Sequence, residues 1–128
     1  MASAVFDASA VIALLRSEPG ADVVAGYLGD ALISTVTLQE VVKALLVRGL
    51  ALDVVRGMIG TLDLELSPHE AVDAYAAAAL YQATKAKGSG LGDRTCLALA
   101  IATGLPAITT DKAWSTLAIP GLTVIQVR

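Results

Sequence analysis

Hydrophobic positions along the chain fall into short runs and longer runs that alternate. Short runs of small or β-branched residues bounded by Gly, Pro or Asp are typical of strands, and longer runs with an apolar helical face are typical of helices. Five strands are predicted, the first closing at Phe6 and the others covering residues 31–34, 62–66, 107–110 and 122–127. Between them the pattern predicts helices over residues 8–15, 21–28, 37–48, 52–59, 67–87 and 93–103, with a short helical turn near 113–115.

This alternation of strands and helices, with short loops between them, predicts the α/β class. Parallel sheets are covered by helices on both faces, so we expect a central, mainly parallel sheet. The runs 31–33 and 107–108 are apolar without interruption and are therefore expected near its centre. With 128 residues and no internal repeats, the chain is expected to form one domain over residues 1–128.

Composition narrows the class of protein. Hydrophobic residues make up 55% of the chain and charged residues 16%, and much of the apolar excess is alanine. The apolar runs are shorter than the roughly 20 residues that cross a bilayer, and the N-terminus lacks the features of a signal peptide. We therefore expect a soluble cytoplasmic protein with no membrane contact. The apolar excess also favours a homodimer and a groove for a protein partner.

Four of the twelve acidic residues lie beside the most apolar elements. Asp7 follows the first strand and Asp111 follows the strand at 107–110, while Glu40 and Asp93 lie near the starts of two helices. Parallel strands that lead into helices end at one edge of the sheet, where α/β proteins place their sites. We therefore expect the four acids to meet at that edge, although for Asp93 the expectation depends on the topology.

Each of these acids also has a purely structural interpretation. Glu40 completes the pattern of a capping box opened by Thr37, and Asp7 and Asp93 are of the residue type preferred at helix N-caps. Asp111 suits the turn that follows its strand. Helix and turn formation therefore explain each acid alone, but they do not explain why all four would reach one edge.

Three further features are interpreted as structural. The segment Ser67-Pro68-His69-Glu70 has the pattern of a capping box that opens the alanine-rich helix, and no chemistry is assigned to it. Cys96 is the single cysteine and lies in an apolar helix, which is typical of a small core residue. Trp114 is expected to anchor the turn after Asp111 in the core.

Four short motifs occur in order over the whole chain: Asp7-Ala8-Ser9, Thr37-x-x-Glu40, Gly92-Asp93-Arg94-x-Cys96-Leu97-Ala98-Leu99-Ala100 and Thr109-Thr110-Asp111-x-x-Trp114. Together they resemble the PIN-domain nucleases, and within these the VapC-type toxins of bacterial toxin–antitoxin pairs. The resemblance implies a three-layer α/β/α fold, a Mg²⁺ or Mn²⁺ site, and endoribonuclease activity controlled by a cognate antitoxin. It also implies that Asp7, Glu40, Asp93 and Asp111 form an acidic cluster, with Ser9 and Thr109 as supporting hydroxyls.

Carboxylates gathered in this way favour a hard divalent cation. Like charges at close range raise one another's pKa, and Mg²⁺ or Mn²⁺ relieves the repulsion through oxygen ligands. We therefore expect metal-dependent hydrolysis of a phosphodiester bond. Asp7 and Asp93 are expected to bind the metal directly, and Glu40 and Asp111 to complete its ligand shell or orient the attacking water.

Positive charge for contacts with RNA is sparse. The formal net charge is −3, and none of the five aromatic residues lies in a basic cluster. Arg94 and Lys112 each adjoin a proposed ligand, and Lys43 lies one turn after Glu40, so these three are candidate substrate contacts. Each has the alternative of being an ordinary solvated charge, and Arg94 has the further alternative of pairing with an acid.

Three other functions match parts of the pattern. A phosphoacceptor receiver domain also binds Mg²⁺, but it would need a second acid beside Asp7 and a Lys after the last core strand. A haloacid-dehalogenase-type phosphatase would need Asp-x-Asp where this chain has Asp7-Ala8-Ser9. A non-catalytic PIN scaffold would act through protein contacts alone, and the presence of all four acids argues against it.

Overall fold

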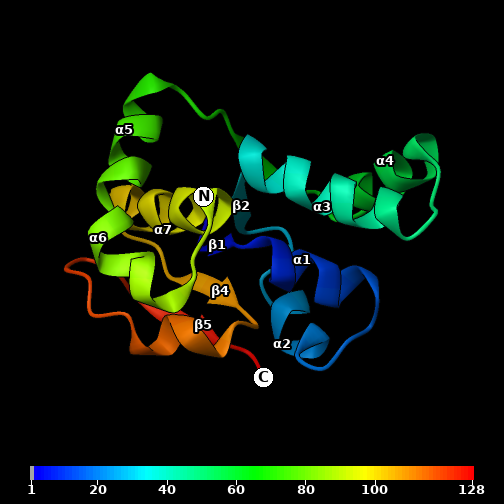
Figure 1. The fold of residues 1–128 in the computed structure, drawn as a ribbon. Helices are drawn as coiled ribbons and strands as arrows, with labels where there is room; N and C mark the ends of the chain where they lie inside the picture. Colours follow the sequence, from blue (N-terminus) through cyan, green and yellow to red (C-terminus); the bar gives the residue numbers. More distant parts are fainter. Residues whose placement is uncertain (1) are drawn as a thin grey trace.

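A single parallel sheet organises the computed structural model, which describes residues 2–128 (Figure 1). Its strands are β1 (Ala4–Phe6), β2 (Ala31–Ser34), β3 (Glu65–Ser67), β4 (Ala107–Thr109) and β5 (Val124–Gln126), in the spatial order β3-β2-β1-β4-β5. Each neighbouring pair is parallel. The predicted parallel sheet is confirmed, and the apolar strands β2 and β4 lie on either side of the central β1.

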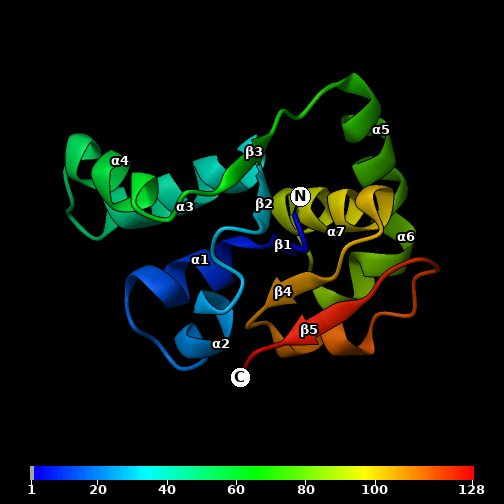
Figure 2. The ribbon, with the colours of Figure 1, turned by 180° about the vertical axis from the view of Figure 1, so that it is seen from behind.

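Seven α-helices and two 3₁₀ helices connect the strands within residues 2–128. The α-helices are α1 (Ala8–Leu15), α2 (Ala21–Ala25), α3 (Thr35–Val47), α4 (Leu52–Gly60), α5 (Ala71–Ala79), α6 (Tyr81–Thr84) and α7 (Leu91–Thr103). The 3₁₀ helices are η1 (Lys85–Lys87) and η2 (Lys112–Thr116). Helices α3 and α4 extend to one side, away from α5, α6 and α7, in both views of the ribbon (Figure 2). None of the helices in this part of the chain is long and apolar enough to cross a membrane.

Two hydrophobic cores lie on opposite faces of the sheet. Successive residues of a strand point to opposite faces, so Phe6 packs with the core under α1 to α4 while its neighbour Val5 packs with the core under α7. The core under α7 also contains Cys96 and Trp114, each about 1% exposed. The three-layer α/β/α arrangement and the structural interpretation of these two side chains are therefore confirmed.

The elements that carry the four acids bring all of them to the carboxyl edge of the sheet. β1 ends directly before Asp7, and β4 ends two residues before Asp111. α3 starts at this edge because it follows β2 without a loop. α7 starts there as well, because it runs back across the sheet to enter the parallel strand β4.

Three predicted helix starts are wrong. α7 begins at Leu91 rather than at residue 93. α3 begins at Thr35 rather than at residue 37, and its N-cap is Ser34, whose Oγ accepts a 3.1 Å hydrogen bond from the backbone N–H of Val36. Thr37 is completely buried inside the helix, so it cannot open a capping box with Glu40. The last strand residue caps the helix because no loop separates β2 from α3.

The alanine-rich helix predicted over residues 67–87 also differs. Ser67 belongs to β3, where it pairs with Ser34, and α5 begins only at Ala71. The backbone N–H of Glu70 donates to Asp73 over 2.9 Å, so the capping contact lies three residues later than predicted. The helical stretch then divides into α5, α6 and η1 and ends at Gly88, whose φ of 67° suits glycine.

The third strand is shorter than predicted. It begins at Glu65 rather than at residue 62, because Asp63 has a φ of 50°, which an extended strand cannot contain. Leu62 is instead buried in the core under α4. Asp63 therefore lies in a turn, and Glu65 begins the strand.

Candidate functional site

Asp7 is the most deeply buried acid at the carboxyl edge, with 5% of its surface exposed. Its Oδ1 accepts hydrogen bonds from Ser9 Oγ at 2.7 Å and from the backbone N–H of Ala10 at 2.8 Å. Its Oδ2 accepts from Thr109 Oγ1 at 2.5 Å and from Ser9 Oγ at 2.9 Å. Asp7 is the N-cap of α1, as its residue type indicates, and its carboxylate is also fixed by the neighbouring strand β4.

The two hydroxyl groups that donate to Asp7, those of Ser9 and Thr109, themselves accept hydrogen bonds from the backbone after β4. Ser9 Oγ accepts from the N–H of Thr110 at 3.0 Å, and Thr109 Oγ1 accepts from the N–H of Asp111 at 3.0 Å. Ser9 and Thr109 therefore bridge the end of β1 to the segment that carries Asp111. These side chains lie 100 residues apart in sequence and their oxygens lie 3.3 Å apart in space.

Glu40 reaches the same edge from the second turn of α3, where it is half-buried. Its carboxylate lies directly against Gly92 in the first turn of α7. Within residues 2–128 the carboxylate of Glu40 has no hydrogen-bond donor or ion-pair partner. A half-buried carboxylate without donors is costly, so this side chain is open to a cation or a proton.

The carboxylates of Asp93 and Asp111 each accept a backbone hydrogen bond at the start of a helix. Asp93 is the third residue of α7, and its Oδ2 accepts from the N–H of Gly90 at 3.1 Å, so the N-cap is Gly90 and the predicted N-cap role of Asp93 is wrong. Asp111 caps η2 by accepting from the N–H of Ala113 at 2.9 Å. Asp93 is half-buried and Asp111 is exposed.

The pKa values of these acids are raised more by burial than by repulsion between their charges. Burial raises the pKa of Asp7 from 3.8 to about 6, against the lowering effect of its hydrogen bonds, and the charge of Asp93 raises it further. Burial also raises the pKa of Glu40 and of Asp93, and nearby carboxylates add to it: Asp93 and Asp7 act on Glu40, and Asp111 acts on Asp93. The four acids therefore influence one another through space, although repulsion is the smaller cause.

The fit to a divalent metal depends on side-chain rotation. As the side chains stand, no three His, Cys, Asp or Glu residues within residues 2–128 are grouped closely enough to hold a metal ion. Asp93 and Asp111 are turned toward backbone N–H groups, while the carboxylate of Glu40 has no such contact. The side-chain atoms available as metal ligands at this edge are carboxylate and hydroxyl oxygens, which suit Mg²⁺ or Mn²⁺. Cys96 is buried, and both its burial and the nearby acids raise the pKa of its thiol.

The basic residues singled out in the sequence differ in their surroundings. Arg94 is half-buried, and its Nη1 donates to the backbone carbonyl of Ser89 at 2.9 Å, which fixes the segment before α7. Its charge also lowers the pKa of Asp93. Lys43 and Lys112 are exposed and form no ion pair with any residue in the range 2–128. Arg94 thus has a structural contact that the two lysines lack.

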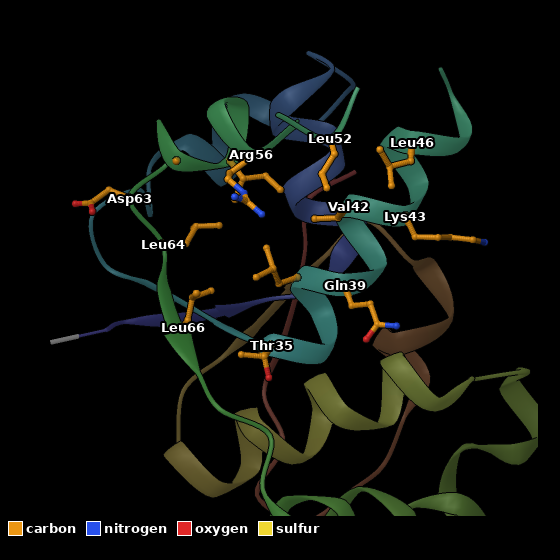
Figure 3. Close-up of a pocket in the computed structure, with 13 residues that line it drawn as sticks. Thr35, Gln39, Val42, Lys43, Leu46, Leu52, Arg56, Asp63, Leu64 and Leu66 are labelled. Atoms are coloured by element: carbon orange, nitrogen blue, oxygen red, sulfur yellow. The ribbon is translucent and has the colours of Figure 1, made fainter. Parts of the chain in front are cut away.

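A large apolar groove lies beside α3, away from the acids (Figure 3). It has a volume of about 660 Å³ and lies between α3, α4 and the edge strand β3. Val42, Leu64 and Leu66 point into the groove and Arg56 reaches into it from α4, whereas Lys43 extends away. None of the four acids lines it. The sequence predicted a groove for a partner but not its place, because its walls come from three separate elements.

The comparisons with known proteins agree with the fold that the structure shows. The sequence model of the PIN domain family matches residues 4–120. Similar solved structures include a toxin–antitoxin complex from Klebsiella pneumoniae, with 24% identity, a TM-score of 0.72, and coverage of 94% of this chain and 96% of that chain. DNA-bound VapBC from Salmonella typhimurium has 17% identity and a TM-score of 0.75 with all of both chains covered. VapBC-5 from Mycobacterium tuberculosis has 25% identity and a TM-score of 0.64, covering 98% of this chain and 99% of its own. No curated protein matches the chain.

Proposed function

Because this chain belongs to the PIN domain family, we propose that it is a metal-dependent endoribonuclease and the toxin of a toxin–antitoxin pair. The family match confirms the resemblance in its motifs and replaces the receiver-domain and phosphatase interpretations. The observation that best supports a nuclease is that Asp7, Glu40 and Asp93, which come from three elements, lie near enough for their charges to act on one another's surroundings: Asp93 raises the pKa of Asp7, and both raise the pKa of Glu40. We also propose that residues 1–128 form one catalytic domain.

The four acids are the proposed metal ligands. Asp7 and Asp93 would bind Mg²⁺ or Mn²⁺ directly, and Glu40 and Asp111 would complete the ligand set. When bound, the ion would polarise a phosphate oxygen and offset the negative charge that develops in the transition state. Asp7 is held by three donors and so keeps one orientation, as supporting hydrogen bonds do around metal ligands.

One oxygen of the Glu40 carboxylate would complete the ligand set, and the other is the proposed acceptor of the proton from the attacking water. Its carboxylate has no donor among the described residues, and burial and the charges of Asp93 and Asp7 raise its pKa. This carboxylate can accept a proton at Oε1 or Oε2 without first breaking a hydrogen bond. The raised pKa describes the protein without metal, and a divalent cation beside these acids would lower it. Ser9 and Thr109 would keep the carboxylate of Asp7 in place while the phosphodiester bond breaks.

Phosphate groups of the RNA would contact the exposed lysines near the edge. Lys112 follows Asp111 directly, and Lys43 lies on α3 one turn beyond Glu40. Arg94 also adjoins the site, with one guanidinium nitrogen already bonded to Ser89. We propose that these three residues supply the positive charge that the net charge of −3 does not, and that the enzyme meets RNA and its partner in the cytoplasm.

The groove beside α3 is the proposed binding site for an antitoxin. Its apolar lining and its size suit an amphipathic segment of a partner protein. Solved structures of similar fold are toxin–antitoxin complexes, which supports a partner of this kind. A homodimer is also proposed, because Val72 and Tyr75 on α5 are 73% and 80% exposed and lie outside the groove.

Substitution of single acids tests the nuclease proposal. Asp7→Asn and Asp93→Asn should each lower Mg²⁺-dependent cleavage of RNA by about 100-fold or more, because each removes a charge on which the metal and the water depend. Cleavage is measured with purified protein over a titration of Mg²⁺ and of Mn²⁺, and folding is checked by circular dichroism.

The matched control is Asp30→Asn, an exposed acid that precedes β2 at the opposite edge of the sheet. It should cleave RNA at the wild-type rate. Wild-type rates in the Asp7 and Asp93 variants would refute the assignment. A wild-type protein that binds its partner but cuts no RNA at any metal concentration would favour the non-catalytic PIN scaffold.

A further inference from the structure

Gly92 occupies a position that a helix would ordinarily not give to glycine. It lies in the first turn of α7, with a negative φ that any residue can adopt. Glycine within a helix is less favourable than alanine because the unfolded chain loses more conformational freedom. The backbone therefore gives no reason for glycine here, and the reason must be sought in the surroundings.

The surroundings of Gly92 are the carboxylate of Glu40. A Cβ atom built on Gly92 would overlap both Oε atoms and the Cδ of Glu40. No other heavy atom is as close to that point, and α3 and α7 pack against each other here. The missing side chain therefore leaves the space in which the Glu40 carboxylate lies, directly beside Asp93.

We propose that Gly92 is a positioning residue that seats the carboxylate of Glu40 within the acidic site. The proposal rests on the proposed nuclease function, because it assumes that Glu40 serves a bound metal. A methyl group at position 92 would force the Glu40 side chain to swing out of the site. Since the displaced group is the far end of a flexible side chain, the fold itself would tolerate the change.

A double-mutant cycle between Gly92 and Glu40 tests this role. Gly92→Ala should raise the Kd for Mg²⁺ and for Mn²⁺ about 10-fold, measured by isothermal titration calorimetry on the whole chain, as expected when a ligand loses its support. In a Glu40→Ala background the same substitution should change the Kd less than 2-fold, because no carboxylate remains to be displaced.

Thermal melting in EDTA gives a readout that does not depend on metal. In the Glu40→Ala background Gly92→Ala should raise Tm by a few degrees, since the helix gains alanine and the space is free. In the wild-type background the gain should be smaller, because the methyl group meets the carboxylate. Gly57→Ala in α4, where nothing lies within 4 Å of the added Cβ, is the matched control and should raise Tm without changing either Kd.

The outcomes separate this inference from the proposed function. Unchanged metal affinity in Gly92→Ala, or an equal loss in both backgrounds, would overturn the role of Gly92 while leaving the nuclease proposal intact. A double variant that fails to fold would also overturn it, because the methyl group would then clash with more than Glu40. Wild-type protein that binds neither ion would instead refute the proposed function, and the melting cycle would still report whether Gly92 and Glu40 are coupled.

Discussion

Asp7 illustrates how one residue can serve both the fold and the site. Its carboxylate caps α1 through Ala10 and ties β1 to β4 through Thr109. These hydrogen bonds favour the charged form, but burial outweighs them and raises the pKa to about 6. A protein without metal therefore retains an acid that takes up a proton well above the pH at which it would in the unfolded chain.

This shift predicts a stability that falls as pH rises. The folded state binds the proton of Asp7 more tightly than the unfolded state, so its stabilising effect is complete below about pH 4 and is lost as pH rises to about 6. The shift corresponds to at most about 3 kcal/mol for Asp7, and Glu40 and Asp93 act in the same direction. Urea denaturation in EDTA from pH 4 to pH 8 should show this decline in the free energy of unfolding.

Asp7→Asn removes the titrating group and supplies the comparison. Its free energy of unfolding should fall less over the same pH range, and above pH 6.5 it should melt at a higher temperature than wild type in EDTA. Such a gain in stability with a loss of cleavage is a known trade-off at active sites. Equal pH profiles for the two proteins would contradict the raised pKa.

At the scale of elements, the start of α3 depends on one side chain at the end of β2. Ser34 caps the helix, while Thr37 lies inside it with its Oγ1 buried and without a hydrogen-bond partner among residues 2–128. Ser34→Ala should therefore lower the free energy of unfolding by about 1 kcal/mol. Thr37→Val should raise it by about 1 kcal/mol, because it removes a buried hydroxyl that makes no bond. Urea denaturation measures both, and a loss of stability in Thr37→Val would show that the buried hydroxyl of Thr37 makes a stabilising hydrogen bond.

The same comparison shows what the sequence can predict about elements. The strands near β1 were predictable because 31–33 and 107–108 are apolar on both faces, as buried parallel strands must be. The cap of α3 was not, because Ser34 and Thr37 are both good caps and only the absence of a loop after β2 decides between them. The φ of Asp63 likewise has no signature strong enough to shorten β3 in advance.

The acids show the same limit at the site. That Asp7, Glu40, Asp93 and Asp111 would approach one edge followed from strand order and from the resemblance in the motifs. Their hydrogen bonds did not follow, because each depends on contacts between residues far apart in sequence. The contact of Glu40 with Gly92 joins two helices, and periodicity within either helix carries no trace of it.

At the scale of the whole molecule, the groove and the acids occupy different surfaces. Helix α3 carries both, with Glu40 facing the edge and Leu46 lining the groove. A partner in the groove would therefore contact the same helix that presents Glu40, without needing to touch the other acids. The groove is therefore separate from the four acids, and Lys43, which lines the groove and is a proposed phosphate contact, is the one residue that the two proposals share.

Adjacent residues of α3 allow that separation to be tested. Leu46→Asp should abolish co-purification with the proposed antitoxin when the two proteins are expressed together, because it places a charge in the apolar groove. Val47→Asp, on a side chain that is 73% exposed and does not line the groove, should leave co-purification unchanged. Both variants should retain the wild-type rate of Mg²⁺-dependent RNA cleavage. Equal co-purification for the two variants would argue that the partner binds elsewhere.

The bridge from Asp7 to Thr109 also has a consequence for how the acidic edge forms during folding. Asp7 and its partner on β4 lie 102 residues apart in sequence, so their hydrogen bond requires the pairing of β1 with β4. Until these two strands pair, the carboxylate of Asp7 lacks the hydroxyl of Thr109, and Asp111 is not yet brought to the same edge. The proposed site therefore assembles together with the centre of the sheet and not before it.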